Sequence, residues 1–159
     1  MTTLKPGNPA PAFDLLDADD RRVSLASFAP GPVIVYFYPA ALTPGCTIEA
    51  IDFSTRLDEF SAAGYRIVGI SPDPTAKLAR FVSAHDLTVT LLSDPDRSVI
   101  DAYGAWGSKV LYGKTMQGVI RSTFVVDVDD AGAGTVRLAQ YNVKASGHVG
   151  RLAGELEID

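Results

Sequence analysis

One cysteine, Cys46, occupies a position in the sequence where a thiol could act as a nucleophile. It is the only cysteine among 159 residues, and it follows a continuous apolar run over residues 33–38 and a Thr-Pro-Gly turn over residues 43–45. Apolar residues then recur at helical spacing, so Cys46 is expected in the first turn of a helix. The unpaired N–H groups and the positive dipole end of that turn favour an anion. The segment therefore predicts a reactive thiolate.

A structural role for Cys46 is the alternative interpretation. A free cysteine in a cytosolic domain usually behaves as a small buried hydrophobic residue. A packing cysteine would be expected within an apolar helix face, whereas Cys46 directly follows the turn over residues 43–45, whose backbone can open towards solvent. This local context favours chemistry over packing.

The segment around Cys46 also resembles a known protein family. Pro39, Thr43 and Cys46 reproduce the Pro-x-x-x-Thr-x-x-Cys signature of peroxiredoxins, and residues 43–47 are similar to the Q-type, or bacterioferritin-comigratory, branch. The other matching segments are residues 5–13, 68–72, 92–95, 103–107, 112–114 and 121–124. This ordered set covers nearly the whole chain. It implies a thiol-dependent peroxidase that reduces hydrogen peroxide and organic hydroperoxides through a sulfenic acid on Cys46.

The resemblance implies roles for several residues, and each role fits the chemistry of peroxide reduction. Cys46 would be the peroxidatic cysteine, with Arg121 beside it as a permanently charged donor to the thiolate and to a peroxide oxygen. Without the family, a surface arginine at a strand end would be the favoured interpretation of Arg121. The Thr43 hydroxyl would bridge thiolate and peroxide, and the N–H groups of Gly45 and Cys46 would point into the same pocket. Pro39 would supply an apolar wall that limits water.

Four further residues have weaker signals. Glu49 lies three residues after Cys46, hence on the same helix face, and resembles a family position, which makes it a candidate substrate-binding residue. An ordinary first-turn acid, favoured by the helix dipole, is an equal alternative. Trp106 is expected in the core or at the pocket rim. His85 and His148 are predicted to be solvated helix residues without a partner acid.

The chain departs from many Q-type members, which carry a second, resolving cysteine. That cysteine lies five residues after the first or on the next helix, but Ile51 occupies the first of these positions and residues 75–85 contain no cysteine. A disulfide within the chain is therefore impossible. The sulfenic acid on Cys46 must be reduced by an external thiol, for which thioredoxin, a glutaredoxin-like protein and a low-molecular-weight thiol are candidates.

Secondary-structure signals give the order of the elements that would position this site. The first half predicts a hairpin over residues 13–16 and 22–25, a strand over 33–38, a helix over 43–63, a strand over 67–70 and a helix over 75–85. The second half adds a strand at 91–92, a helix over 98–103, strands over 123–126 and 136–143, and a helix over 146–156. This order indicates an α/β fold with parallel pairing. We expect a single thioredoxin-like domain over residues 1–159, with a mixed central sheet flanked by helices and an N-terminal β-hairpin.

Composition argues against several other functions. The net charge of -5, the pI near 4.9 and the lack of a basic cluster make a nucleic-acid partner unexpected. No segment has the apolar length of a signal peptide or a membrane span, so a cytoplasmic protein without a membrane partner is expected. The two histidines and one cysteine show no metal-site spacing, and no cofactor is expected. The branch resemblance suggests a monomer or weak homodimer.

Two other functions stay open at this point. A cysteine hydrolase would need His85 or His148 beside Cys46 as a general base, and nothing in the sequence places either residue there. A thioredoxin-fold binding or redox-sensing domain would be oxidised at Cys46 without catalytic turnover. Repeated consumption of peroxide in the presence of an added thiol would distinguish a peroxidase from such a sensor.

Overall fold

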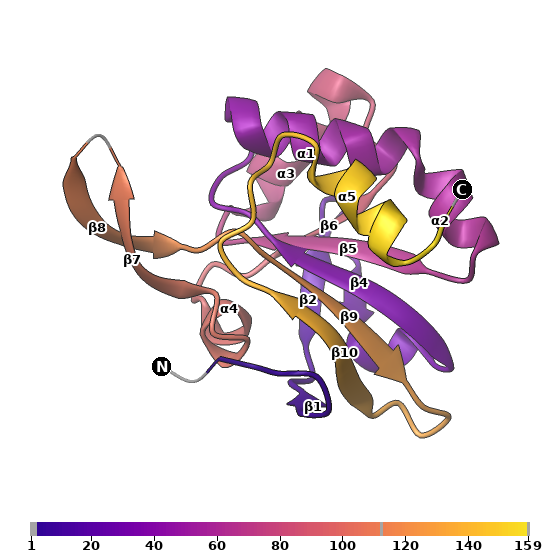
Figure 1. Cartoon of the computed structure of the whole chain (residues 1–159). Helices are drawn as coiled ribbons and strands as arrows, with labels where there is room; N and C mark the ends of the chain where they lie inside the picture. Colours follow the sequence, from indigo (N-terminus) through magenta and orange to yellow (C-terminus); the bar gives the residue numbers. More distant parts are fainter. Residues whose placement is uncertain (1–2, 112, 159) are drawn as a thin grey trace.

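The computed structural model describes residues 3–111 and 113–158, which form a large sheet, a separate hairpin and short helices (Figure 1). The large sheet has the strand order β1-β10-β9-β4-β5-β6-β2-β3. Its strands are β1 (Pro9–Ala10), β2 (Asp14–Asp17), β3 (Arg22–Ser24), β4 (Gly31–Phe37), β5 (Arg66–Ser71), β6 (Thr90–Ser93), β9 (Ser122–Val128) and β10 (Gly134–Gln140). The helices are η1 (Leu25–Phe28), α1 (Pro44–Thr55), α2 (Leu57–Ala62), α3 (Thr75–His85), α4 (Ser98–Ala102) and α5 (His148–Glu155). None of these helices is long and apolar enough to cross a membrane.

The central strand β4 is buried on both faces of the sheet, as its unbroken apolar run predicts. Val33, Val35 and Phe37 face one core, together with α4 and the 3-10 helix η1. Ile34 and Tyr36 face the other core, which α1, α2, α3 and α5 cover (Figure 1). β4 pairs in parallel with β5, and β5 with β6, while the other pairs are antiparallel. The predicted mixed sheet flanked by helices and the predicted N-terminal hairpin, β2–β3, are therefore confirmed.

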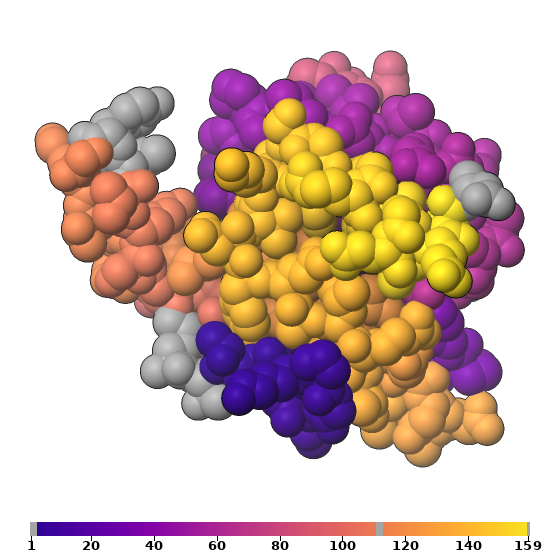
Figure 2. All heavy atoms as spheres, viewed as in Figure 1, coloured from indigo at the N-terminus to yellow at the C-terminus, as the bar shows by residue number. Residues whose placement is uncertain are grey.

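Several features differ from the sequence-based expectations, among them the short strand β1 and the 3-10 helix η1, which were not expected. The single helix expected over residues 43–63 is wrong: α1 and α2 are separate, since Arg56 leaves helical geometry with φ -101° and ψ 11°. A second hairpin, formed by β7 (Trp106–Leu111) and β8 (Lys114–Val119), was not expected. Its side chains Val110 and Met116 are exposed, so the strands lack the alternation of a half-buried strand. Figure 2 shows this hairpin standing away from the body of the molecule, with a hollow between them.

The strand directions bring several chain segments to one edge of the sheet. β4 ends at Phe37, and the antiparallel strand β9 begins beside it, with Ser122 paired to Phe37. β10 runs antiparallel to β9, so its end at Gln140 lies opposite Thr123 at the same edge. The start of α1 after β4, the residue before β9 and the start of α5 after β10 therefore meet there.

Candidate active site around Cys46

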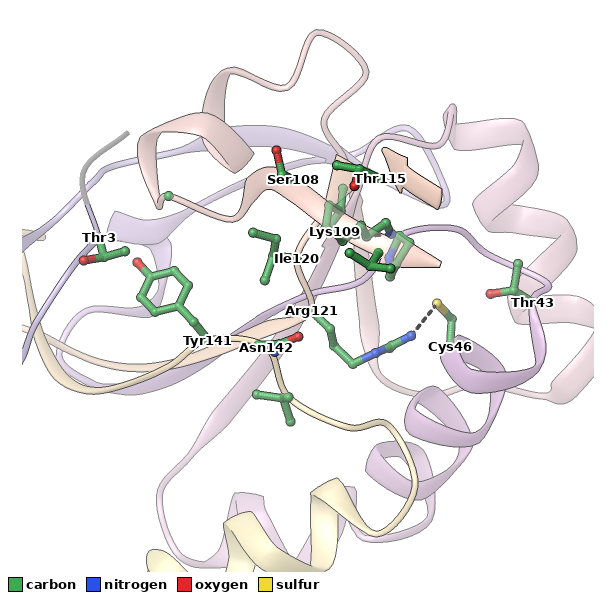
Figure 3. Close-up of a pocket in the computed structure, with 15 residues that line it drawn as sticks. Thr3, Thr43, Cys46, Ser108, Lys109, Thr115, Ile120, Arg121, Tyr141 and Asn142 are labelled. Atoms are coloured by element: carbon green, nitrogen blue, oxygen red, sulfur yellow. Dashed lines mark hydrogen bonds between the residues drawn. The ribbon is translucent and has the colours of Figure 1, made fainter. Parts of the chain in front are cut away.

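Cys46 lies in the first turn of α1, at this edge of the sheet. The helix begins at Pro44, directly after Thr43, which has an extended backbone (φ -90°, ψ 154°). Proline suits the first helical position because its φ is already helical and its missing N–H would have no partner there. The Cys46 side chain is buried, and its sulfur faces Arg121 (Figure 3). The predicted position of the thiol in the first helical turn is confirmed.

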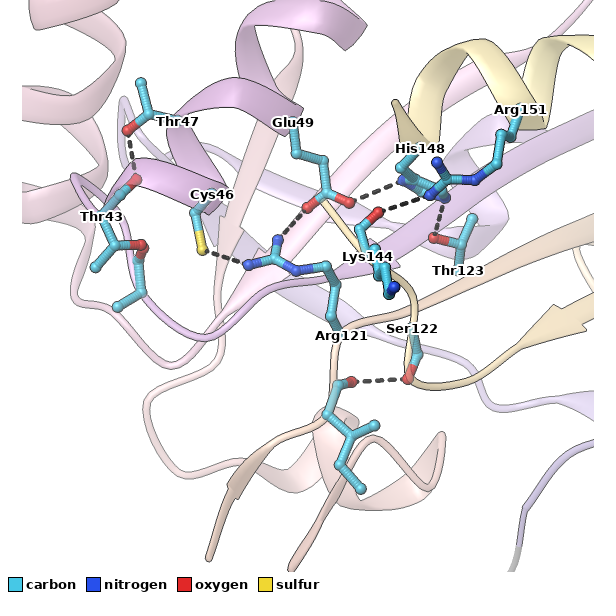
Figure 4. Close-up of polar contacts among 12 residues, drawn as sticks. Thr43, Cys46, Thr47, Glu49, Arg121, Ser122, Thr123, Lys144, His148 and Arg151 are labelled. Atoms are coloured by element: carbon cyan, nitrogen blue, oxygen red, sulfur yellow. Dashed lines mark hydrogen bonds and ion pairs between the residues drawn. The ribbon is translucent and has the colours of Figure 1, made fainter. Parts of the chain in front are cut away.

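Arg121 directly precedes β9 and reaches the Cys46 sulfur. Its Nη2 donates to Sγ at 3.3 Å, and its Nη1 donates to Glu49 Oε1 at 2.6 Å (Figure 4). Burial opposes the charge on the guanidinium, but the Glu49 carboxylate and Cys46 outweigh it and raise the pKa of Arg121 above its ordinary value. The arginine therefore keeps its positive charge at any working pH, next to the Cys46 sulfur.

Glu49 and His148 continue this polar chain away from the sulfur. Glu49 is fully buried, and its second oxygen, Oε2, lies 2.8 Å from Nδ1 of His148. The other ring nitrogen, Nε2, lies 3.1 Å from Oγ1 of Thr123. The prediction that His148 is solvated and has no partner acid is wrong, because the first turn of α5 packs onto the sheet and buries the ring. His85 is exposed, as predicted.

The other predicted residues surround the sulfur from the loop before α1 and from its first turn. Thr43 Oγ1 donates to the carbonyl of Ala40 at 2.7 Å, which leaves the lone pairs of this hydroxyl to accept a hydrogen bond. Pro39 and Thr43 both line the pocket that contains Cys46. A Cβ atom at Gly45 would lie 3.4 Å from Nη2 of Arg121, so this glycine leaves room for the guanidinium.

A pocket of about 960 Å³ opens beside Cys46, in the hollow between the β7–β8 hairpin and the body of the molecule (Figure 3). Apolar side chains such as Val119 and Ile120 form part of its wall. Trp106, at the base of the hairpin, is partly buried against the core. The guanidinium of Arg97 lies 4.0 Å from the centroid of its ring. The predicted placement of Trp106 in the core or at the pocket rim is therefore confirmed.

Asp73 supports the site from the loop after β5, a role that the sequence analysis did not predict. Its side chain is buried, and its Oδ2 accepts a hydrogen bond from the N–H of Ala41 at 2.7 Å. The Ser71 hydroxyl donates to the same oxygen at 2.9 Å, and Nζ of Lys77 lies 3.1 Å from Oδ1. Asp73 therefore holds the loop that leads to Thr43. Its Ser-Pro-Asp-Pro context predicts only a turn.

The arrangement supplies the parts that a thiolate needs to attack an electrophilic oxygen. Arg121 can stabilise the negative sulfur and then the charge on the oxygen that leaves. On the other side of the pocket, Thr43 can accept a hydrogen bond from the molecule that carries this oxygen. A cysteine hydrolase is not supported, because both ring nitrogens of His148 contact Glu49 and Thr123 instead of Cys46. Within the described residues, no group of His, Cys, Asp or Glu side chains could hold a metal ion.

Comparison with known proteins identifies the family. The family model described as "AhpC/TSA family" matches residues 6–142. A protein of Mycobacterium tuberculosis (strain CDC 1551 / Oshkosh) that is named as a peroxiredoxin is 59% identical over 157 residues, which cover 99% of this chain and 98% of that protein. Peroxiredoxin Bcp of Escherichia coli (strain K12) is 45% identical over 129 residues, which cover 81% of this chain and 83% of that protein.

A solved structure has the same fold. The structure of the bacterioferritin comigratory protein of Xanthomonas campestris matches this chain with a TM-score of 0.81 and 32% identity. That structure was described in connection with the alkyl peroxide reduction activity of the protein. The match covers 91% of this chain and 90% of that one, which confirms the thioredoxin-like fold expected from the order of the predicted elements. The chain therefore belongs to the AhpC/TSA family, and within it to the peroxiredoxins of the Q-type branch, which are thiol-dependent peroxidases.

Proposed function

We propose that Cys46 carries a one-cysteine peroxidase cycle and that the pocket beside it receives the hydroperoxide. The observation that supports this assignment most is the 3.3 Å contact between Nη2 of Arg121 and the Cys46 sulfur in the pocket wall. A fixed positive donor in a site with limited water stabilises the thiolate before attack. The same donor then faces the oxygen on which charge develops.

The first step transfers one oxygen atom to the sulfur. The Cys46 thiolate attacks the terminal oxygen of ROOH, an S–O bond forms, the O–O bond breaks, and the sulfenic acid and RO⁻ result. Arg121 stabilises RO⁻, which takes a proton from solvent to become ROH. The Thr43 hydroxyl, which donates to a backbone carbonyl, accepts a hydrogen bond from the O–H of the peroxide. Pro39 keeps water away from the reacting atoms.

The first turn of α1 adds backbone donors to this step. In this turn the N–H of Thr47 donates a hydrogen bond to the carbonyl of Thr43, which is the first hydrogen bond of the helix. The N–H groups of Gly45 and Cys46 precede it and therefore have no intrahelical acceptor. Both can donate to the thiolate or to a peroxide oxygen. Glu49 is fully buried, and both of its carboxylate oxygens are hydrogen-bonded. We therefore propose that Glu49 positions Arg121 and does not contact the substrate, unlike the substrate-binding role suggested by the sequence.

The second step uses an external thiol, since Cys46 is the only cysteine. Attack of that thiol on the sulfenic sulfur releases water and forms a mixed disulfide, and a second thiol then releases Cys46. Thioredoxin, a glutaredoxin-like protein and a low-molecular-weight thiol each fit this chemistry. We place the cycle in the cytoplasm, in a single domain that acts as a monomer or weak homodimer.

The pocket can receive organic hydroperoxides in addition to hydrogen peroxide. Its apolar wall, which includes Val119, Ile120 and Val143, can hold an alkyl group while the peroxide oxygens reach Cys46. The Xanthomonas campestris relative was described for alkyl peroxide reduction. We extend that substrate class to this chain.

The test compares the reduced protein with its Cys46→Ser variant. One equivalent of hydrogen peroxide or cumene hydroperoxide should give the wild type an adduct of one oxygen that dimedone traps, and excess dithiothreitol should sustain peroxide consumption. The variant should show neither, with an unchanged circular dichroism spectrum, because serine has no accessible anion at neutral pH. Sustained consumption by the variant would refute the assignment of Cys46. A single oxidation of the wild type without turnover would indicate a redox sensor.

A further inference from the structure

We infer that His148 is a positioning residue of this peroxidase, because it holds the Glu49 carboxylate in the orientation that keeps Arg121 on the Cys46 sulfur. This inference rests on the proposed function. It concerns a residue 99 positions away from Glu49 in the sequence, on the helix α5, which supplies no residue to the pocket itself.

The His148 ring is fixed from three sides. Its side chain is 2% exposed, Nδ1 lies 2.8 Å from Glu49 Oε2, and Nε2 lies 3.1 Å from Thr123 Oγ1 (Figure 4). The ring also packs edge-on against Phe53, with centroids 5.7 Å apart and an interplanar angle of 84°. Any rotation of the ring would break both polar contacts, so His148 has one orientation in the folded protein.

The chemistry of the groups fixes the direction of the hydrogen bond between Glu49 and His148. The Glu49 carboxylate, which accepts from Arg121 through Oε1, is an acceptor at Oε2 as well. Nδ1 of His148 must therefore carry a hydrogen and donate it. The contact of Nε2 with the Thr123 hydroxyl leaves this assignment unchanged, since a hydroxyl both donates and accepts.

This bond matters because the carboxylate is held at its two ends by residues with different tasks. His148 fixes Oε2, which sets the plane of the carboxylate, and Oε1 then fixes Nη1 of Arg121 at 2.6 Å. The guanidinium is planar and rigid, so the position of Nη1 determines where Nη2 meets the sulfur at 3.3 Å. Without the Nδ1 donor, Oε2 is a buried acceptor that must seek another donor, and the carboxylate would turn and move Arg121.

Two substitutions at His148 separate this role from packing. In His148→Asn the side-chain amide can donate from near the place of Nδ1, whereas in His148→Gln it reaches the place of Nε2 and leaves Oε2 without its donor. Leu152→Ala is the control for α5 docking, since Leu152 is buried in the same core and lacks polar atoms in its side chain. The measurements are the thermal midpoint and the rate constant for Cys46 oxidation by hydrogen peroxide, from quenched-flow mass spectrometry.

The expected pattern is a split between rate and stability. His148→Gln should slow oxidation at least about tenfold, since small displacements of a catalytic group have effects of this size or larger. His148→Asn should recover most of that loss, and Leu152→Ala should lower the thermal midpoint while its rate stays close to that of the wild type. A wild-type rate in His148→Gln, or rates that simply follow the thermal midpoint across the three variants, would overturn the inference.

A measurement on the wild-type protein keeps the inference testable if His148→Gln does not fold. Long-range ¹⁵N–¹H NMR correlations of the reduced protein should show a hydrogen on Nδ1 of His148. A ring that carries its hydrogen on Nε2 alone would overturn the inference. Failure of the wild-type Cys46 to react with peroxide would instead refute the proposed function, so the two failures are distinguishable.

Discussion

Replacement of Arg121 by methionine removes the charge and both donors that link Cys46 to Glu49 while keeping an unbranched side chain of similar length. Nη1 of Arg121 donates to a carboxylate that is 0% exposed, and the arginine side chain itself is 15% exposed. The substitution therefore leaves the Glu49 carboxylate buried with His148 as its remaining described polar partner. It also leaves the Cys46 sulfur without the donor that Arg121 provides at 3.3 Å.

The size of the two effects follows from this geometry. Removal of one partner from a buried ion pair costs roughly 3–5 kcal/mol, and the partial exposure of Arg121 places the loss of unfolding free energy near the lower end of this range. Loss of a single donor that stabilises developing negative charge slows a reaction by roughly 100-fold to 1,000-fold. Arg121→Met should therefore show a stability loss of about 3 kcal/mol and a rate loss of at least about 100-fold.

Arg137→Met is the matched control for this prediction. Arg137 pairs with Asp127 at the protein surface, where both side chains are nearly half exposed, and such pairs contribute about 0–1 kcal/mol. Urea unfolding measures the free energy of unfolding of both variants, and quenched-flow mass spectrometry measures the rate of Cys46 oxidation. The reasoning is refuted if Arg121→Met oxidises as fast as Arg137→Met, or if its unfolding free energy matches that of the control.

Three further predictions follow from the same structure. Gly69→Ala should lower the unfolding free energy by about 1–3 kcal/mol in urea titrations, because its Cβ would lie 2.5 Å from Cζ of Tyr36; an unchanged midpoint would contradict this packing. Asp73→Ala leaves a loop N–H without its acceptor, so peroxide oxidation should slow and stability should fall by about 1–3 kcal/mol; a wild-type rate would exclude its role in placing the loop. In Ile51→Cys, mass spectrometry should show a disulfide with Cys46 forming more slowly than the sulfenic acid, because residues five apart on α1 can bond only after the helix unwinds locally; formation of both products at the same rate would refute this order.

The sheet and the first-turn position of Cys46 could be predicted because local patterns specify them. An unbroken apolar run identified β4 as a strand covered on both faces, and a proline and glycine before Cys46 marked the start of a helix. The break between α1 and α2 has no such marker, since Arg56 is a good helix former at an ordinary position. The β7–β8 hairpin has little buried surface of its own, and exposed strands lose the period-two signal.

The polar chain behind Cys46 depends on contacts between residues far apart in the sequence. Arg121 and Cys46 are separated by 75 positions, and only the family resemblance suggested that they meet. The topology explains the contact afterwards, because β9 begins beside the end of β4. For His148 a local signal did exist: it lies four residues before the buried Leu152, so both share the apolar face of α5. Its partner acid, on α1, could not be inferred from that spacing.

The two halves of the cycle place different demands on access to Cys46. Cys46 is 2% exposed as a residue, and hydrogen peroxide reaches it through a pocket of about 960 Å³. A low-molecular-weight thiol can use the same route. A cysteine of a protein must bring its own backbone to within a Cα–Cα distance of about 4.4–6.8 Å to form the mixed disulfide. That approach requires the first turn of α1 to move. Oxidation helps this movement, because the sulfenic acid lacks the negative charge that strengthens the bond from Arg121 to the sulfur. We therefore expect that Arg121 holds the first turn of α1 less firmly after Cys46 is oxidised, and that a protein reductant acts on this loosened turn.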